Sequence, residues 1–314
     1  MEHTLPGLPW ASWSQTKDTL HLWTQIVGKI QLGTTAPRNH WWHTTLHVTE
    51  SGFATGRMTS GGTSFSIAFD LAGHRLVVRT AGAEKTIPLR DGLSVAEFYR
   101  TLLALLRDLG ISVEIKAEPF GVPMTTPFAE DTEHASYDPE RVEEFRRALE
   151  WADGTLREFQ SWFCGKSSPV QLYWHSFDLA TARFSGRPAP VREGAGPVES
   201  EAYSHEVISA GWWAGDPSSP EPAFYSYTHP EPGDLVKRPL SPDGAFWAPA
   251  GTTHQARLDW SEVLASGDPR DTVLDFLQSA YAAGAVTAGW PYDELHTSWC
   301  PPRGIVDPSA VAGS

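Results

Sequence analysis

Apolar residues recur at three- and four-residue intervals in four stretches of the chain, and this spacing predicts helices with one buried face. The stretches cover residues 20–30, 94–109, 138–163 and 268–284. Ser94 and Asp138 stand where a side-chain oxygen caps the first turn of a helix, and Glu97 completes a capping box with Ser94. Gly28 is expected to end the first helix, because glycine often follows the last helical residue.

Between the helices, β-branched and aromatic residues alternate with polar ones, which predicts strands. The expected strands cover residues 39–49, 52–58, 64–71, 74–80, 83–88, 111–116, 170–184, 202–213 and 223–229. The lead-in over residues 1–16, the Pro- and Gly-rich residues 230–253 and the tail over residues 291–314 are expected to be irregular. Runs of strands enclosed by helices indicate an α+β fold, in which helices cover one face of mainly antiparallel sheets.

The order of motifs in the first half of the chain returns in the second half. The recurring motifs are Gly28-Lys29 with Trp42-His43, and Gly165-Lys166 with Trp174-His175. A repeated unit that cannot close its own core packs on its copy, so we expect one pseudo-symmetric, pseudo-duplicated domain over residues 17–290. Its halves cover residues 17–116 and 139–288, and residues 117–138 connect them. Coincidence is the alternative, because the chain holds 14 Trp and 12 His.

Composition and charge narrow the classes of function. The chain has 40% hydrophobic and 20% charged residues, typical of a globular protein, and a formal net charge of −14. Such a chain lacks the basic surface that nucleic acids and anionic membranes attract. We also expect no membrane span and no signal peptide, because no long apolar run and no basic leader occur. Two cysteines, Cys164 and Cys300, exclude a disulfide framework, so we expect a cytoplasmic protein. Oligomerisation stays open.

Several stretches together resemble the DUF5996 family of uncharacterised bacterial proteins. They are residues 22–30 (LWTQIVGKI), 39–43 (NHWWH), 133–140 (EHASYDPE), 177–187 (FDLATARFSGR), 201–206 (EAYSHE) and 223–231 (AFYSYTHPE). The resemblance rests on many motifs in the same order and spans most of the chain. It implies no particular activity and no catalytic residue, so the candidate site comes from this chain alone.

The second half carries polar and aromatic residues where the aligned first half is apolar. The alignment sets Phe65-Ser66-Ile67-Ala68-Phe69 against Tyr203-Ser204-His205-Glu206-Val207. Strand alternation puts Tyr225, Tyr227 and His229 on one face, and it puts His175 with Arg183 on one face of the preceding strand. These hydrogen-bonding groups are too many for an ordinary core, and they predict a concave pocket in the C-terminal half.

Acid–base chemistry is the activity that these residue types favour. The predicted catalytic residues are His175 and His205, with Glu206 or Asp178 orienting a histidine. The predicted substrate-binding residues are Tyr203, Tyr225, Tyr227, His229, Arg183, His43 and His134. His134 is included because the connector that carries it can border a pocket. For each single histidine the alternative is a structural one, bonded to a backbone carbonyl or facing water.

The spacing of the histidines does not favour a metal site. His175, His205, Glu206 and His229 offer ligands for zinc or non-haem iron, but adjacent strand residues such as 205 and 206 point to opposite faces. No H-E-x-x-H motif occurs, so we predict no tightly bound zinc or iron and leave the cofactor unknown.

The expected function is a small-molecule enzyme with an aromatic, histidine-containing pocket in the C-terminal half. The alternative is a non-catalytic protein that binds a small molecule or another protein through its aromatic faces. No nucleophile elbow and no phosphate-binding loop occurs in the sequence. The sequence therefore indicates where a ligand would bind, but it names neither substrate nor reaction.

Overall fold

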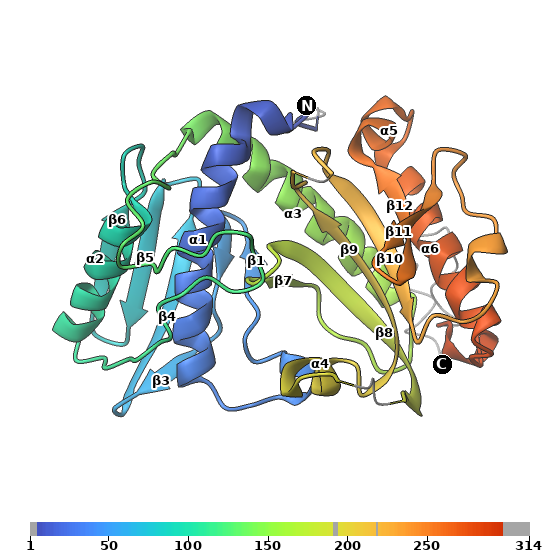
Figure 1. Cartoon of the computed structure of the whole chain (residues 1–314), viewed down its shortest axis with the longest axis horizontal. Helices are drawn as coiled ribbons and strands as arrows, with labels where there is room; N and C mark the ends of the chain where they lie inside the picture. Colours follow the sequence, from blue (N-terminus) through green and yellow to red (C-terminus); the bar gives the residue numbers. More distant parts are fainter. Residues whose placement is uncertain (1–4, 191–193, 218, 298–314) are drawn as a thin grey trace, which may run out of the picture. The chain divides into compact units, whose positions relative to one another are not determined.

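The computed structural model describes residues 5–190, 194–217 and 219–297 of the chain. These residues form two compact units. The first unit draws on residues 5–153, 171–179, 213–217 and 219–222, and the second on residues 154–170, 180–190, 194–212 and 223–297. One helix, α3, and one strand, β8, pass from the first unit to the second along the chain (Figure 1). Cys300 and most of the predicted tail lie outside the described residues.

The first unit is built from two long helices and an antiparallel sheet. Helix α1 spans Trp10–Thr34 and α2 spans Val95–Asp108, and the two helices pack against each other (Figure 1). The strands are β1 His47–Thr49, β2 Gly52–Ala54, β3 Met58–Ser60, β4 Thr63–Asp70, β5 Arg75–Thr80 and β6 Glu84–Pro88. Their order is β1-β2-β4-β5-β6, and β3 pairs with β4. The predicted hairpin of β4 and β5 and the predicted edge strand β6 are confirmed.

Alternation along β4 explains how this sheet holds its helices. Phe65, Ile67 and Phe69 are buried, while the residues between them are partly exposed. The Phe69 ring stacks on Phe98 of α2 at 6.3 Å between ring centroids, and Phe98 stacks on Trp23 of α1 at 5.1 Å. Truncating a buried phenylalanine of this kind to alanine costs roughly 3–5 kcal/mol, so these three rings tie the two helices to the sheet.

The predicted caps position two of the helices. The Ser94 hydroxyl accepts the backbone N–H of Glu97 at the start of α2. Helix α3 spans Pro139–Ser161, and the Asp138 carboxylate accepts the N–H groups of the next turn. In the first unit, Phe145 of α3 stacks on Trp13 at 5.2 Å and on Phe177 at 5.3 Å. These aromatic contacts extend the apolar core of the first unit.

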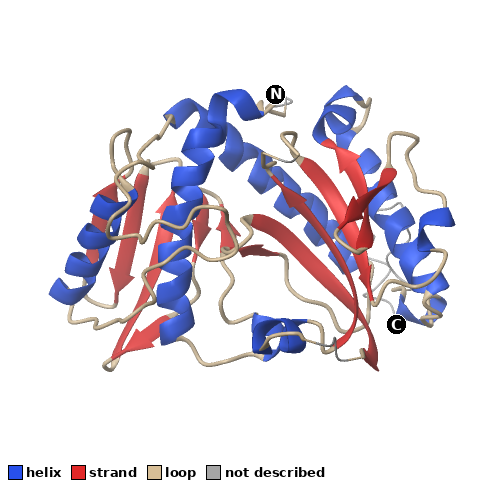
Figure 2. Ribbon diagram, viewed as in Figure 1, coloured by secondary structure: helices blue, strands red, loops and turns tan. Residues whose placement is uncertain are grey.

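The second sheet is also antiparallel where its register is defined, and its strands are red in Figure 2. The strands are β7 Gln171–Tyr173, β8 Asp178–Pro188, β9 His205–Trp213, β10 Ala223–His229, β11 Phe246–Ala250 and β12 Thr253–Asp259. Their order is β11-β12-β10-β9-β8-β7. The remaining helices are α4 Pro197–Ala202, α5 Trp260–Ala265 and α6 Pro269–Thr287, and the short 3-10 helices are η1 Asn39–Trp41, η2 Leu235–Lys237 and η3 Asp293–Leu295.

Helix α6 packs closely on this sheet because of one glycine. A Cβ atom at Gly284 would lie 2.2 Å from Oγ1 of Thr228 and 2.9 Å from Cδ1 of Ile208. The missing side chain therefore lets the helix approach β9 and β10. The predicted start of α6 is confirmed, since the Asp268 carboxylate accepts the N–H of Asp271. None of the helices in the described part of the chain is long and apolar enough to cross a membrane.

The first helix differs from its prediction at both ends. It begins at Trp10, inside the expected irregular lead-in, and it continues through Gly28 to Thr34. Gly28 does not end the helix, because it serves a packing role there. A Cβ atom at this position would lie 2.2 Å from Cγ of Trp174, so only glycine leaves room for the indole ring.

Several strand predictions are wrong or incomplete. Residues 52–58, expected as one strand, contain β2 and only the first residue of β3. Residues 39–49 form η1 and turns before β1, and His40 and Trp41 have φ angles of 55° and 62°. Residues 111–116 are irregular. Residues 230–253 contain β11, which pairs with β12, so proline and glycine there concealed a hairpin. The strand expected over 170–184 is divided by a turn at residues 174–177 into β7 and β8.

The expected internal duplication stays a prediction. Both halves open with a long helix and continue with a sheet, but β12 lies between β10 and β11, whereas β6 follows β5 directly. Trp42 follows η1, and Trp174 lies in the turn after β7. The single domain over residues 17–290 likewise stays a prediction.

Candidate functional site

Helices α3 and α6 pack on one face of the second sheet, and the candidate site lies on its other face. Arg183 of β8 contacts aromatic rings of α3 and α6, and Thr228 of β10 lies beside Gly284 of α6. Because side chains alternate along a strand, the residues next to Thr228 in β10 point away from α6. Tyr227 and His229 flank Thr228, and Tyr225 shares their face because it lies two residues before Tyr227.

We call Tyr203, Tyr225, Tyr227 and His229 the tyrosine face. The hydroxyl groups of Tyr203 and Tyr227 share a hydrogen bond of 3.1 Å, and the Tyr203 ring lies 4.8 Å from the His229 ring. The rings of Tyr225 and Tyr227 are nearly parallel, at 4° and 6.3 Å between centroids. Tyr225 is buried and the other three are half-buried. The structure therefore gathers four of the predicted substrate-binding residues.

Tyr203 reaches this face by a route that the sequence did not predict. It lies at the C-terminal end of α4, two residues before β9, and not within a strand. Its backbone N–H bonds to the carbonyl of Glu199 in the last turn of that helix. The helix end, rather than strand alternation, therefore directs the phenol toward Tyr227.

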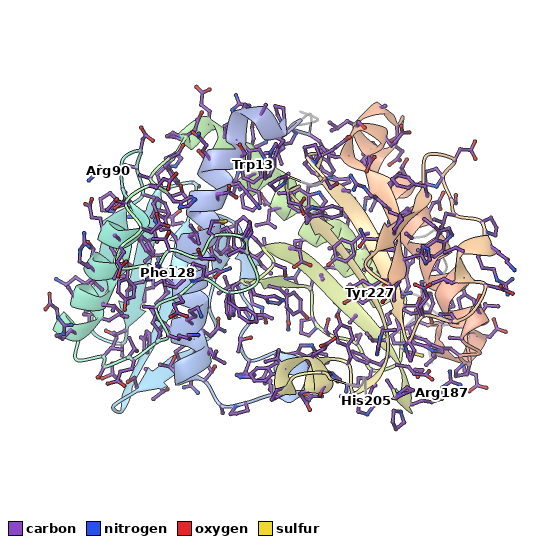
Figure 3. All side chains as sticks on the ribbon, viewed as in Figure 1. Trp13, Arg90, Phe128, Arg187, His205 and Tyr227 are labelled. Carbon is purple, nitrogen blue, oxygen red and sulfur yellow. The ribbon has the colours of Figure 1, made fainter. Side chains whose placement is uncertain are left out.

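His205 opens β9 and lies on the same side of the sheet as the tyrosine face. It is three residues before Ile208, which packs under α6, so alternation turns His205 to the other face. Its Nδ1 atom is 3.1 Å from the Ser204 hydroxyl, and the side chain is half-buried. Figure 3 labels His205 and Tyr227 on the second sheet.

Glu206 lies on the helix-covered face and does not orient His205. Its carboxylate accepts hydrogen bonds from Ser185 and from Nε of Arg187, each at 2.8 Å. Arg187 also donates to the carbonyls of Ala288 and Gly289, just after α6 ends. A cation at a helix C-terminus is favourable, so Arg187 and Glu206 form a structural link. Glu206 was predicted as one of two carboxylates that could orient a histidine, and its hydrogen bonds go to Ser185 and Arg187 instead.

His175 and Asp178 belong to the first unit, unlike His205 and Glu206. The His175 side chain is exposed in the turn between β7 and β8, and its backbone carbonyl lies 3.2 Å from Nε2 of His21. Asp178 accepts a hydrogen bond from Ser176. The four predicted catalytic residues are thus not gathered within one unit.

His21 was not singled out by the sequence, yet it is the most perturbed histidine of this region. It is 2% exposed, and burial lowers its pKa to about 3. Its ring stacks on Phe177 at 5.0 Å, and Nε2 lies 3.1 Å from the carbonyl of Trp174. His21 is therefore neutral at physiological pH, and its imidazole holds the turn at residues 174–177. The residues on either side of His21 in the sequence are apolar, so the sequence pattern gives no sign of its role. Only the observed contact with the turn reveals that role.

His43 and His134 hold backbone in the first unit. Nδ1 of His43 accepts the N–H of Arg38, and burial lowers the pKa of His43. His134 bonds through Nδ1 to Asp131 at 2.8 Å, and Asp131 is 1% exposed. Asp131 also accepts two backbone N–H groups of its own turn. These contacts give both histidines a structural role, and a ligand contact for either stays a prediction.

Sequence reasoning missed two neighbours of the tyrosine face. Arg257 of β12 stands opposite Tyr225 in the strand register, and Phe246 of β11 stands opposite Arg257. Opposed residues in an antiparallel pair share a face, so Arg257 and Phe246 extend the row from Tyr225. Arg257 also pairs with Asp259. The alternation of Ala256 and Leu258 in β12 was a usable signal, hidden by the proline-rich segment before it.

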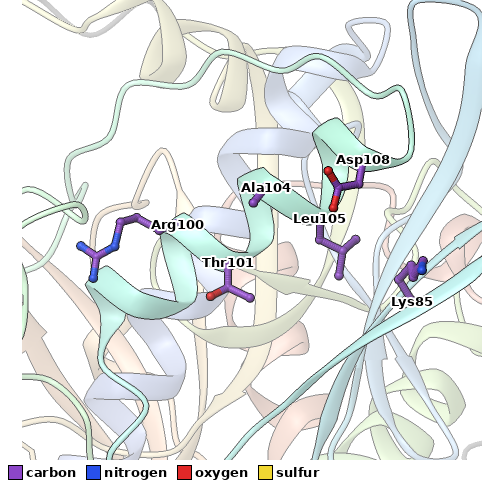
Figure 4. A pocket seen from close by; sticks show the side chains of 6 residues that line it. All are labelled: Lys85, Arg100, Thr101, Ala104, Leu105 and Asp108. Atoms are coloured by element: carbon purple, nitrogen blue, oxygen red, sulfur yellow. The ribbon is translucent and has the colours of Figure 1, made fainter.

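No sequence-predicted residue lines either of two surface hollows that the described residues form. A hollow of about 490 Å³ lies beside α2, lined by Lys85, Arg100, Thr101, Ala104, Leu105 and Asp108 (Figure 4). Another, of about 520 Å³, lies near residues 241–244. Within residues 5–190, 194–217 and 219–297, no three His, Cys, Asp or Glu side chains form a group that could hold a metal ion.

Comparison with known proteins adds the family but no activity. No curated protein and no solved structure matches the chain. The family model of DUF5996, a family of unknown function, matches residues 5–297, which is nearly the whole chain. The chain therefore belongs to the DUF5996 family.

Proposed function

We propose that this protein binds a small, flat, polar organic molecule on the tyrosine face. The observation that carries the proposal is the 3.1 Å contact between the hydroxyls of Tyr203 and Tyr227, beside the His229 ring. A few convergent polar groups among aromatic rings are typical of ligand sites.

The ring geometry supports a flat ligand. Tyr225 and Tyr227 present nearly parallel rings, and Phe246 lies along the same row of the sheet. Aromatic pairs gain about 0.5–1.5 kcal/mol beyond area burial when their faces or edges meet. Tyrosine also offers a hydroxyl while losing little side-chain entropy, which suits it to contact with polar ligands.

An acid–base enzyme is the second candidate. The close approach of Tyr203 to His229, with His205 on the same side, favours it because imidazole and phenol groups transfer protons. Under this candidate, Glu206 is not the orienting carboxylate, since it is bonded to Arg187. We also propose a cytoplasmic location for this protein, because its two cysteines provide no disulfide framework.

Saturation-transfer NMR with benzamide tests the binding proposal. Benzamide is flat, neutral and polar, and cyclohexanecarboxamide is its puckered counterpart with the same amide group. We expect benzamide to bind and cyclohexanecarboxamide to bind more weakly. Tyr227→Phe keeps the ring but removes the hydroxyl, and a lost neutral hydrogen bond weakens binding about three- to tenfold.

Tyr99→Phe is the matched control, because Tyr99 is a half-buried tyrosine of the first unit. It should leave benzamide binding unchanged. Equal binding of benzamide to the wild type and to Tyr227→Phe would contradict the proposal, and so would the absence of any saturation transfer.

A further inference from the structure

Arg183 is a buried cation held among aromatic rings on the helix-covered face of the second sheet. The residue is 1% exposed. Its Cζ atom lies 3.6 Å from the ring centroid of Phe159, 4.3 Å from that of Tyr281 and 5.3 Å from that of Phe163. Cation–π attraction stabilises such an arrangement, but it leaves the guanidinium N–H groups in the ring plane without acceptors.

The hydrogen bonding of this guanidinium is incomplete. Nη2 donates to the backbone carbonyl of Phe159, whereas Nε and Nη1 have no hydrogen-bond partner among the described residues. Among the residues that the structure describes, no carboxylate forms an ion pair with Arg183. Burial lowers the pKa of Arg183 to about 9, so the group stays cationic at neutral pH. A buried charge without a counter-charge is rare in proteins, because desolvation opposes it strongly.

Other buried donors around Arg183 are also unsatisfied. Within the described part of the chain, the Tyr281 hydroxyl and Nε1 of Trp290 have no hydrogen-bond partner, and these residues are 0% and 5% exposed. Their rings lie 6.3 Å apart, and Tyr281 also contacts Arg183. Arg183 and Tyr281 thus supply unused N–H and O–H groups side by side, and Trp290 adds an N–H group next to Tyr281. A hydrogen-bond acceptor that carries a negative charge would satisfy these donors and balance the guanidinium.

We propose that Arg183, with Tyr281 and Trp290, binds the carboxylate of a small organic monoacid. One guanidinium balances one negative charge, which favours a monocarboxylate over a phosphate dianion. The aromatic walls formed by Phe159 and Phe163 favour an organic acid over a small inorganic ion. This site is separate from the tyrosine face, which lies on the other side of the sheet.

The segment over residues 291–297 packs on Tyr281 of this site and sets its access. Cys164 N–H donates to the carbonyl of Leu295, and Thr297 N–H donates to that of Trp162. Tyr292 stacks on Tyr281 at 5.4 Å, and Gln278 bonds to the Tyr292 hydroxyl at 2.8 Å. The ligand therefore enters when this segment moves away from α6. Opening breaks these local contacts but leaves the sheet and α6 intact, so it costs less free energy than unfolding the unit.

Thermal melting of the full chain tests the proposal, with benzoate as the probe at constant ionic strength. A ligand that binds only the folded state raises the melting temperature as its concentration rises. We expect benzoate to raise the melting temperature of the wild type and to have no effect on Arg183→Met. Without benzoate, Arg183→Met should be at least as stable as the wild type, because an uncompensated buried charge is replaced by an apolar side chain.

Tyr281→Phe is the second variant, which removes one donor and keeps both the charge and the ring. Tyr281→Phe should weaken benzoate binding several-fold, and so reduce the rise in melting temperature, while the protein stays folded. It tests the proposal even if Arg183→Met does not fold. Equal benzoate shifts in all three proteins, or none in the wild type, would overturn the proposal. Equal stabilisation by inorganic phosphate would overturn the assignment to a monocarboxylate. Neutral benzamide at the same concentrations is the control for binding on the tyrosine face.

Discussion

Replacing Gly28 with alanine should destabilise the first unit, although alanine is the better helix former. The added Cβ would lie 2.2 Å from Cγ of Trp174 and 2.5 Å from Cδ1 and Cδ2, which are atoms of a rigid ring. Alanine gains about 1 kcal/mol over glycine within a helix, whereas overpacking a core costs about 1–3 kcal/mol. The indole cannot swing away without moving the turn that His21 holds. The difference between the two is the net effect, so we expect Gly28→Ala to lower the free energy of unfolding by about 1 kcal/mol.

Gly154→Ala provides the matched control in the same assay. Gly154 is an exposed residue inside α3, and a Cβ there would have no heavy atom within 4 Å. It should therefore raise stability by about 0.5–1 kcal/mol. Urea denaturation followed by tryptophan fluorescence measures both variants. The reasoning is refuted if Gly28→Ala is as stable as the wild type while Gly154→Ala shows its expected gain.

Three further substitutions have defined outcomes. Below its unfolded pKa of about 6.5, buried His21 resists protonation, so stability falls toward pH 3 by up to about 1.4 kcal/mol per pH unit. His21→Gln should flatten that slope in urea titrations at several pH values. His205→Ile, at a half-buried strand start, should leave thermal stability neutral or higher but weaken benzamide binding; unfolding would show a structural role. Glu206→Gln should leave benzamide binding unchanged and lower stability by about 1 kcal/mol or less, since its partner Arg187 is exposed.

Local signals predicted the parts of the fold that local interactions determine. The capping residues Ser94, Asp138 and Asp268 all cap their helices, and alternation along β4 located a buried face. Gly28 misled the prediction because its role depends on Trp174, which lies far away in the sequence. A glycine that permits close packing and a glycine that ends a helix look the same in one sequence.

The candidate site was predicted only in part, for a related reason. Strand alternation correctly placed Tyr225, Tyr227 and His229 together, since that rule is local. It placed Arg183 with them because nothing in the sequence indicates which face of a strand the helices cover. The structure puts Arg183 under α3 and α6 instead. Arg257 was missed because its strand pairs with β10 across a proline-rich segment.

A crystal structure of the protein with benzamide tests the central claim most directly. We predict that benzamide lies on the tyrosine face, with its ring against Tyr225 or Tyr227 and its amide within hydrogen-bond distance of the Tyr203–Tyr227 hydroxyl pair. Benzamide bound only elsewhere on the molecule, or an empty tyrosine face at concentrations that give saturation transfer in solution, would contradict it.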